Sequence, residues 1–200
     1  MNVLKKLYGP ILGKYKQLKD ISKAFIIVEL VASLSWNIII PVIGKLQGLY
    51  WAASWIALYH IGRQMGNFIV SYIKDKYELS EFYRIIVILD VLYLLSINIY
   101  YINVKIFLII EAILMVVYAA VMGAAEIKFN THLVKKYGSD EYDKAAEVEK
   151  SVSAAAAVVG YLVIMALDVL MPMEHYMGII AAMLVVNLVF RYRYYAKYWR

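Results

Sequence analysis

The stretch IFLIIEAILMVVYAAVMGAAEI, residues 106–127, decides the fold class of this chain. A helix needs about 20 mostly apolar residues to cross a bilayer, and this stretch supplies them with Glu111 and Glu126 as its charged side chains. Similar runs recur along the whole chain. The expected spans are Ser22–Gly44, Tyr50–Ile73, Arg84–Asn103, Ile106–Ile127, Ser151–Leu170 and His175–Tyr195. We therefore predict an all-α integral membrane protein with six transmembrane helices.

The composition favours lipid as the solvent and gives no sign of an enzyme. Of 200 residues, 64% are hydrophobic and 18% are charged, whereas soluble domains have about 45–50% and about 25%. The chain has no cysteine, and its histidines at positions 60, 132 and 175 lack metal-ligand spacing. A phosphate-binding glycine loop and a nucleophile elbow are also missing from the sequence. We expect neither catalysis nor a cofactor or metal.

The distribution of lysine and arginine predicts the orientation in the membrane. All but Lys45, Lys105 and Arg63 of the 21 basic residues lie in the N-terminal segment, near 74–84 and 128–150, or at the C-terminus. Cytoplasmic loops carry such an excess, so we predict a multi-pass protein of the cell membrane with both termini in the cytoplasm. Short basic blocks between apolar runs face anionic lipid, and no nucleic-acid partner is expected. The predicted divisions are a basic amphipathic segment (1–21), the bundle (22–195) and a cytoplasmic tail (196–200).

Ionisable side chains inside the spans are candidates for function, because each costs about 2.5–3.5 kcal/mol to insert at the centre of a membrane helix. Arg63 is the only cation deep within the expected spans, so we predict an ion pair with Asp90 or Glu29. Such a pair can equally be a structural link between helices. Glu111 has no cation at its depth and is the best candidate for a group that changes its protonation or meets a cationic ligand.

Polar residues recur at helical spacing on three of the expected helices. On the first and fourth spans the shared faces are Glu29, Ser33, Trp36 and Asn37, and Glu111, Met115, Tyr118 and Met122. The second span has a polar stripe of His60, Gln64, Asn67 and Ser71, which hydrogen bonds between helices would also explain. From these faces we predict the residues that bind substrate or couple protons, namely Glu111, Glu29, Asn37, Tyr118 and His60.

The segment SYIKDKYELSEFYR, residues 71–84, is similar to the helix 2–3 signature of the major facilitator superfamily, GxxxD[RK]xGR[RK]. Ser71 stands at the glycine position, Asp75 at the aspartate and Lys76 at the basic residue. The later glycine and arginines of the signature are missing, and Arg84 supplies a later cation. Six spans with cytoplasmic ends also resemble one six-helix half of such a transporter. The alanine-rich fifth span looks like that family's helix 5, without its glycine–proline motif.

The resemblance implies a cytoplasmic gate formed by Asp75 and Lys76, with Glu126 as their partner within the same half. It also implies that the first and fourth spans face a substrate cavity, and that the second and fifth pack against another half. Members of the family normally carry two six-helix halves, so we expect a half-size secondary transporter that acts as a homodimer or with a partner half.

Two other functions remain open from sequence. One is a non-transporting accessory, immunity or scaffold subunit, and the other is the permease subunit of an ATP-driven exporter. A transporter is expected to lose activity on Glu111→Gln while still folding, whereas a scaffold should be indifferent.

Overall fold

The computed structural model describes residues 2–73, 77–170, 172 and 175–199. These residues form α-helices and no strand: α1 (Asn2–Gln17), α2 (Asp20–Gln47), α3 (Leu49–Ile73), α4 (Leu79–Ile102), α5 (Val104–Tyr137), α6 (Ser139–Leu170) and α7 (Tyr176–Tyr198). Five of them, α2, α4, α5, α6 and α7, are long and apolar enough to cross a membrane. The prediction of an all-α protein of the helical membrane class is confirmed at this level.

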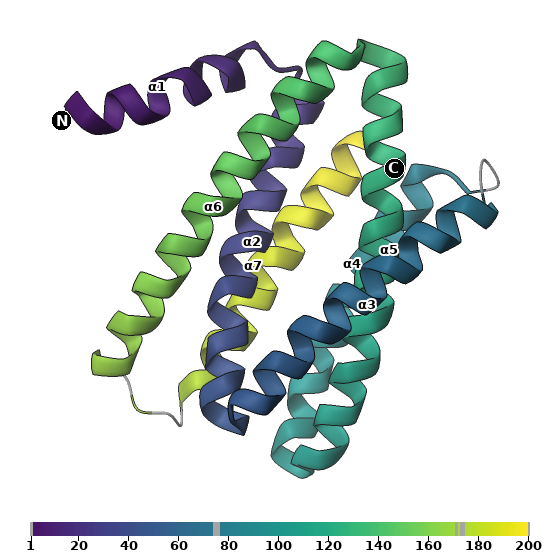
Figure 1. Ribbon diagram of the computed structural model, residues 1–200. Coiled ribbons are helices and arrows are strands. Elements are labelled where there is room, and N and C mark those ends of the chain that lie inside the picture. Colours follow the sequence, from purple (N-terminus) through teal and green to yellow (C-terminus); the bar gives the residue numbers. More distant parts are fainter. Residues whose placement is uncertain (1, 74–76, 171, 173–174, 200) are drawn as a thin grey trace.

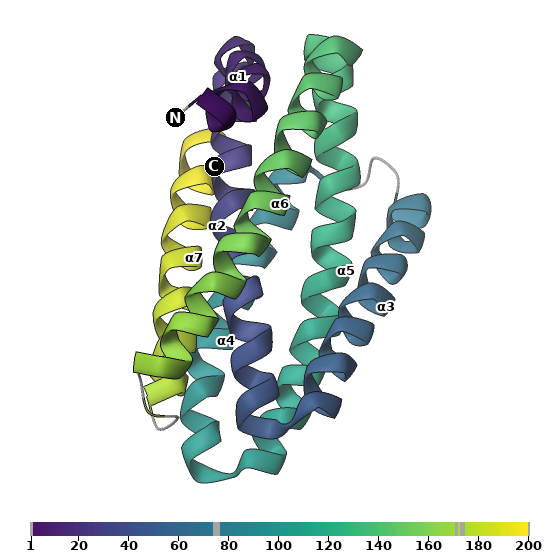
Figure 2. The same ribbon diagram turned by 60° about the vertical axis from the view of Figure 1, so that its left-hand side comes forward.

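Helix α3 is the predicted span that does not reach the hydropathy of the others. It is long enough, with 25 residues, but His60, Arg63, Gln64 and Asn67 lower its hydropathy. It nevertheless runs beside α5 along the bundle (Figure 1, Figure 2). A sixth span at α3 therefore stays a prediction.

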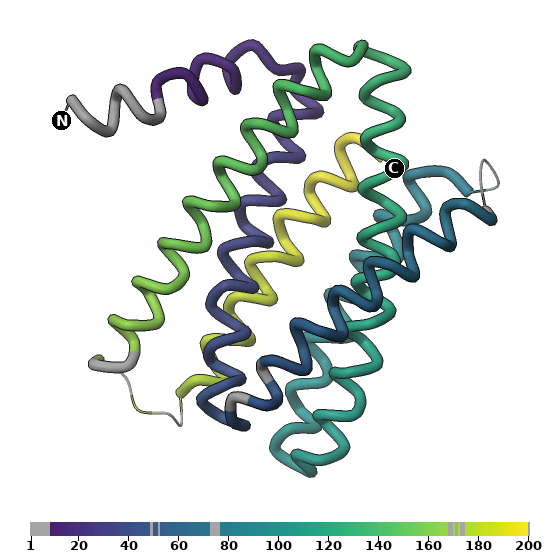
Figure 3. The backbone as a smooth tube through the Cα atoms, viewed as in Figure 1, coloured from purple at the N-terminus to yellow at the C-terminus, as the bar shows by residue number. Residues whose placement is uncertain are grey.

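The chain alternates between the two ends of the bundle (Figure 3). The α2–α3 and α4–α5 connections, the end of α6 and the start of α7 lie at one end (Figure 1). The other end, here called the terminal end, carries both termini and the α5–α6 turn (Figure 1). Gly48 and Gly138 make two of the turns with φ values of 95° and 90°, a region that is costly for residues with a Cβ.

The segment 128–150, expected to be a loop, is helical instead. Helix α5 continues to Tyr137 and α6 begins at Ser139, so the two helices extend beyond α3, α4 and α7 at the terminal end (Figure 1). At the other predicted boundary, residues 196–198 continue α7. The amphipathic sequence of 128–150 and the break at Gly138 explain a helical hairpin in place of a loop.

Helix α1 crosses the terminal end at a steep angle to the bundle (Figure 1). Lys14 forms an ion pair with Glu147 of α6. Where α1 turns into α2, the Glu141 carboxylate accepts hydrogen bonds from the Lys19 backbone N–H at 2.8 Å and the Ser22 hydroxyl at 2.6 Å. A carboxylate at this position satisfies donors that the first turn of a helix leaves free, and it ties α2 to α6.

The principal helix contacts are symmetric between two groups of three consecutive helices, the triplets α2–α3–α4 and α5–α6–α7. Helix α2 packs against α6 and α7, α5 packs against α3 and α4, and α4 packs against α7. The remaining pairs of the bundle are α2 with α3 and α5 with α6. Exchanging each helix with its counterpart in the other triplet leaves this set of pairs unchanged. Because the helices alternate in direction, the counterparts run in opposite senses, as in an inverted repeat.

Small residues occupy equivalent interfaces in the two triplets. On α3, a Cβ at Gly62 would lie 2.5 Å from a carbonyl oxygen of α5, and a Cβ at Gly66 would overlap the Ala120 carbonyl. On α6, a Cβ at Gly160 would lie 2.7 Å from the Asn37 Cβ of α2. The second helix of each triplet therefore approaches the first helix of the other at backbone distance, which glycine permits.

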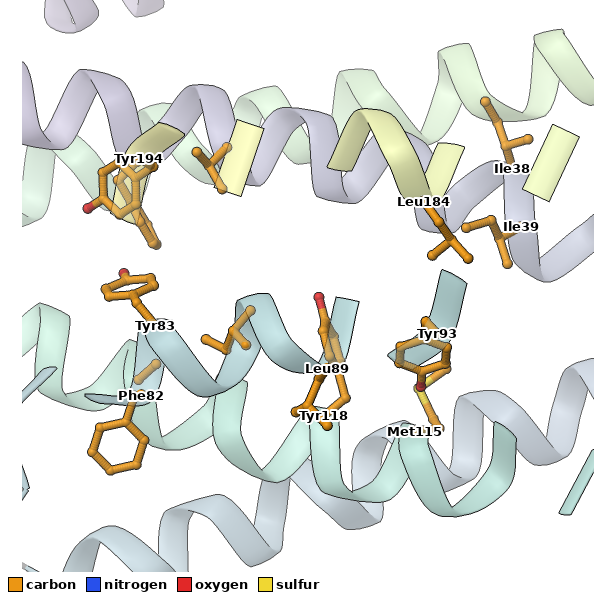
Figure 4. Close-up of a cluster of buried hydrophobic side chains, with 14 of the residues drawn as sticks. Ile38, Ile39, Phe82, Tyr83, Leu89, Tyr93, Met115, Tyr118, Leu184 and Tyr194 are labelled. Carbon is orange, nitrogen blue, oxygen red and sulfur yellow. The ribbon is translucent and has the colours of Figure 1, made fainter. Parts of the chain in front are cut away.

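The core lies where α2, α4, α5 and α7 meet. Aliphatic and aromatic side chains of these four helices point toward one another there (Figure 4). They include Ile38, Ile39, Leu89, Tyr93, Met115, Tyr118 and Leu184.

We predict that Gly66→Ala lowers the free energy of unfolding by about 1–3 kcal/mol, the usual cost of forcing a methyl group into a packed interface. Unfolding by SDS in mixed micelles measures it. Gly178→Ala is the matched control, because nothing lies within 4 Å of a Cβ at Gly178 and alanine favours the helix by up to about 1 kcal/mol. Equal stability of the two variants would contradict the close α3–α5 approach.

Candidate functional site

A cavity of about 320 Å³ lies between α2 and α6 on one side and α3 and α5 on the other. This volume suits a small organic ligand. Its lining combines polar, charged and aromatic side chains. The principal ones are Glu29, Ser33, Trp36, Asn37, Tyr59, His60, Arg63, Tyr118, Glu149, Ser153 and Arg191.

A second cavity of about 270 Å³ adjoins the first toward the terminal end. The two share Glu29, Arg63, Met122 and Glu149, and the second is also lined by Glu126. Arg63, Glu29 and Glu149 therefore lie where the two cavities meet. Together the cavities lead from the middle of the bundle toward the terminal end.

Four of the five predicted substrate or proton-coupling residues line the first cavity: Glu29, Asn37, Tyr118 and His60. They come from α2, α5 and α3, which the packing of α3 along α5 brings together. The helix faces chosen by their spacing thus meet in space. What these residues do there stays a prediction.

Glu111 lies outside the cavity. It is 3% exposed and accepts a hydrogen bond from the Ser96 hydroxyl of α4. The ring of Trp36 lies 5.7 Å from that of Tyr93 and 5.8 Å from that of Tyr118. Trp36 lines both the cavity and a small void beside Glu111, so this aromatic cluster lies between the two. Glu111 shares a helix face with Tyr118 but sits one aromatic layer further from the terminal end.

The predicted ion pair of Arg63 with Asp90 or Glu29 is wrong. The Arg63 guanidinium pairs with Glu126 of α5 and donates to the Tyr59 hydroxyl at 3.1 Å. The cause is the packing of α3 along α5, which is close at this level. A Cβ at Gly123 of α5 would lie 3.0 Å from the Arg63 carbonyl oxygen.

Asp90 pairs instead with Arg191 of α7. The Arg191 Nη1 atom lies 3.1 Å and 3.3 Å from the two carboxylate oxygens of Asp90, and the two side chains are 5% and 1% exposed. The Arg191 guanidinium also lies 5.1 Å from the centre of the Tyr118 ring. This pair links the third helices of the two triplets at the α4–α7 interface.

Sequence reasoning missed Arg191 because it counted the residue with the basic C-terminal tail. The signal that could have identified it is helical spacing. Buried positions recur along α7 and continue past the apolar part of the helix to Met177, Ile180, Leu184, Asn187, Arg191 and Tyr194. Glu149 was missed for a similar reason, since it was placed in a loop rather than on a face of α6.

Glu29 and Glu149 are half-buried and, unlike the four charges of the two ion pairs, form no salt bridge. Both line both cavities. Among the described residues, neither carboxylate has a hydrogen bond or an ion pair with another side chain. Glu29 interacts electrostatically with Arg191, Glu126 and Arg63. Glu149 interacts with Glu29 and Glu126 as like charges and with Arg63 and Lys150 as opposite charges.

The predicted gate residues are placed only in part. Ser71 is exposed near the end of α3 and donates to the Phe68 carbonyl at 2.7 Å, and Arg84 is exposed on α4. Glu126 is held by Arg63. Asp75 and Lys76 lie outside the described residues, so the gate stays a prediction.

The predicted polar stripe of α3 is exposed along its whole length, at His60, Gln64, Asn67 and Ser71. Its contacts are local: the Asn67 amide donates to the Gln64 side-chain oxygen at 3.4 Å. The alternative that the stripe serves hydrogen bonding to neighbouring helices finds no contact among the described residues of this chain. The side chains of the stripe are therefore free to contact water or another protein.

A wider groove of about 840 Å³ opens at the terminal end, between the ends of α3, α4, α5 and α7. Tyr77, Lys128, His132 and Trp199 are among its lining residues. None of the predicted substrate residues lines it, and the middle cavity therefore remains the candidate site.

Comparison with known proteins found no matching family model, no matching curated protein and no matching solved structure. The functional argument therefore depends on the fold and the cavity.

We predict that Asp90→Asn lowers the free energy of unfolding by about 3–5 kcal/mol, because it leaves the Arg191 charge buried without its partner. The double variant Asp90→Leu/Arg191→Met should recover most of that loss, since replacing both charges by apolar groups is often neutral. SDS unfolding measures both. Glu147→Gln, which breaks the exposed pair with Lys14, should cost about 0–1 kcal/mol. A double variant as unstable as Asp90→Asn would contradict a structural ion pair.

Proposed function

We propose that this chain is a subunit of a secondary transporter. It supplies one six-helix half of the major-facilitator type and works with a second six-helix bundle, either another copy of itself or a separate partner half. The observation that carries this proposal is the cavity between α2, α3, α5 and α6, which polar, charged and aromatic side chains line midway along the helices. Secondary transporters bind their substrates near the bilayer midplane, at the interface between repeats.

The helix packing supports the family assignment. Each half of a major facilitator transporter contains two three-helix repeats of inverted topology. The exchange of α2–α3–α4 with α5–α6–α7, which preserves the helix pairs, is the arrangement that such repeats produce. Under this proposal α3 is the sixth span, both termini are cytoplasmic, and the terminal end faces the cytoplasm.

The exposed polar stripe of α3 supports a second bundle. Lipid-exposed polar side chains are costly, and intramembrane polar residues almost always face protein or a water-filled cavity. His60 belongs both to the stripe and to the cavity lining. Helices α3 and α6 do not pack extensively against each other in the described chain, so the cavity opens between them. A second bundle docked on α3 and α6 closes the cavity on that side.

Alternating access then follows from the position of Arg63. Its pair with Glu126 stands where the two cavities adjoin. Movement of one bundle against the other opens the substrate site to each side of the membrane in turn, and the Arg63–Glu126 pair stabilises the closed path toward the terminal end.

We predict that the protein purified from its native membrane in mild detergent has a protein mass of two six-helix chains rather than the 23.0 kDa of one. Native mass spectrometry measures it and separates a homodimer from a complex with a partner half. A stable monomer would contradict the proposal and favour an accessory subunit. Copurification of an ATPase would favour an ATP-driven exporter.

Spin labels test whether the α3 stripe faces protein or lipid. The chain has no cysteine, so Asn67→Cys and Leu95→Cys each give one labelling site, and both positions are exposed. We expect the label at position 67 to be poorly accessible to molecular oxygen, which concentrates in lipid, and the control label on α4 to be accessible. Equal oxygen accessibility would show that the stripe lies in lipid, against the proposal.

A further inference from the structure

The charges around the two cavities do not cancel. Six aspartate, glutamate and arginine side chains lie in or beside them: Glu29, Arg63, Asp90, Glu126, Glu149 and Arg191. Arg63 is paired with Glu126, and Arg191 is paired with Asp90. Both cations therefore already have their counter-charge, and two carboxylates, Glu29 and Glu149, are in excess. An unpaired charge is costly where water is excluded, and a cation bound from outside the chain would offset the excess.

Aromatic rings form much of the remaining lining. Trp36, Tyr59 and Tyr118 come from three different helices and border the same space as the two carboxylates. The negative face of an aromatic ring attracts a cation, and more strongly where water is excluded. The same rings give apolar area for the body of a ligand, as aromatic linings do in small-molecule sites.

An unsatisfied hydroxyl gives independent reason to expect a ligand. Tyr118 is 1% exposed, and its hydroxyl has no hydrogen bond of ordinary geometry among the described residues, although it interacts with the nearby Arg191 guanidinium. Its ring points away from α5 into the space between the helices (Figure 4), where it lines the cavity. Buried hydroxyl groups are normally hydrogen-bonded, and a polar group or bound water of an occupied site would satisfy this one.

We propose that the cavity binds an organic cation, a molecule with one positive charge on an apolar or aromatic body. Glu29 and Glu149 supply the counter-charge from α2 and α6, and Trp36 and Tyr118 contact the apolar body. As a transport substrate this ligand class rests on the proposed function, but binding itself depends on the cavity alone.

Other ligand classes fit less well. An anion would add to the excess of carboxylates, because neither arginine is free to receive it. An inorganic metal ion needs a compact set of ligands, and no group of three His, Cys, Asp or Glu side chains with that geometry occurs in the described part of the chain. A neutral solute would leave both carboxylates uncompensated.

Two matched pairs of probes test the charge preference on the assembly purified from its native membrane into nanodiscs. Tetraphenylphosphonium and tetraphenylborate have the same shape and opposite charge. Phenyltrimethylammonium and tert-butylbenzene are a smaller pair, cationic and neutral. Titration calorimetry, with empty nanodiscs subtracted, should show saturable binding of at least one cation and no saturable binding of its partner probe. If neither cation binds saturably, or if each partner probe binds as well as its cation, the proposal is overturned.

Charge-neutralising variants locate the site. Glu29→Gln and Glu149→Gln should each weaken cation binding by about tenfold or more, as loss of one partner of a buried charge pair does. Asp143→Asn removes the same charge from an exposed position of α6 and should leave the affinity unchanged. A melting curve for each variant establishes that it is folded. If a variant is unfolded, Trp36→Leu replaces it and should weaken binding of the aromatic cation. Unchanged affinity in all folded cavity variants would overturn the assignment.

A flux assay separates this inference from the proposed function. The same assembly in liposomes, loaded with the cation that binds, reports transport. Saturable binding without flux would support the proposed cation site and contradict the proposed transport function. A confirmed two-bundle assembly that binds neither cation would keep the proposed architecture and overturn the ligand class.

Discussion

A charged side chain in an apolar medium must meet an opposite charge or another polar partner, and this constraint organises the bundle. The insertion cost of each charge is several kcal/mol, so each fixes which helix faces turn inward. Asp90 and Arg191 join α4 to α7 at the centre, and Arg63 and Glu126 join α3 to α5. When the two triplets are exchanged, the α4–α7 interface maps onto itself and the α3–α5 interface maps onto the α2–α6 interface. Glu29 and Glu149 are the charges that this scheme leaves unpaired, and they lie at the cavity.

Close helix approach and the open cavity are two consequences of one arrangement. Gly62 and Gly66 bring α3 onto α5, and Gly160 brings α6 onto α2. The second helix of each triplet thus packs closely against the first helix of the other triplet. The two tightly packed pairs then face each other across the space that holds the polar side chains. The polar stripe on the outer face of α3 remains exposed, which is why the proposed function includes a second bundle.

Much of the site was predictable from residue types and spacing, because helical periodicity identifies which side chains share a face. Glu29, Asn37, His60 and Tyr118 were chosen in this way, and all four line the cavity. Glu111 belongs to the same face as Tyr118, but periodicity carries no information about where along the face a cavity ends. The aromatic cluster of Trp36, Tyr93 and Tyr118 determines that limit. The pairing of Arg63 was mispredicted because depth along separate helices does not say which helices touch.

The sequence by itself determined the helical membrane class, the approximate extents of most helices and the polar faces that must turn away from lipid. These follow from local properties: apolar runs long enough to span a bilayer, and side chains that recur every three or four residues. Only the tertiary structure decided that Arg191 is a buried partner of Asp90, that Glu149 faces the cavity and that two carboxylates are left unpaired. The physical reason is that an ion pair depends on the distance between side chains on different helices, and that distance is set by packing.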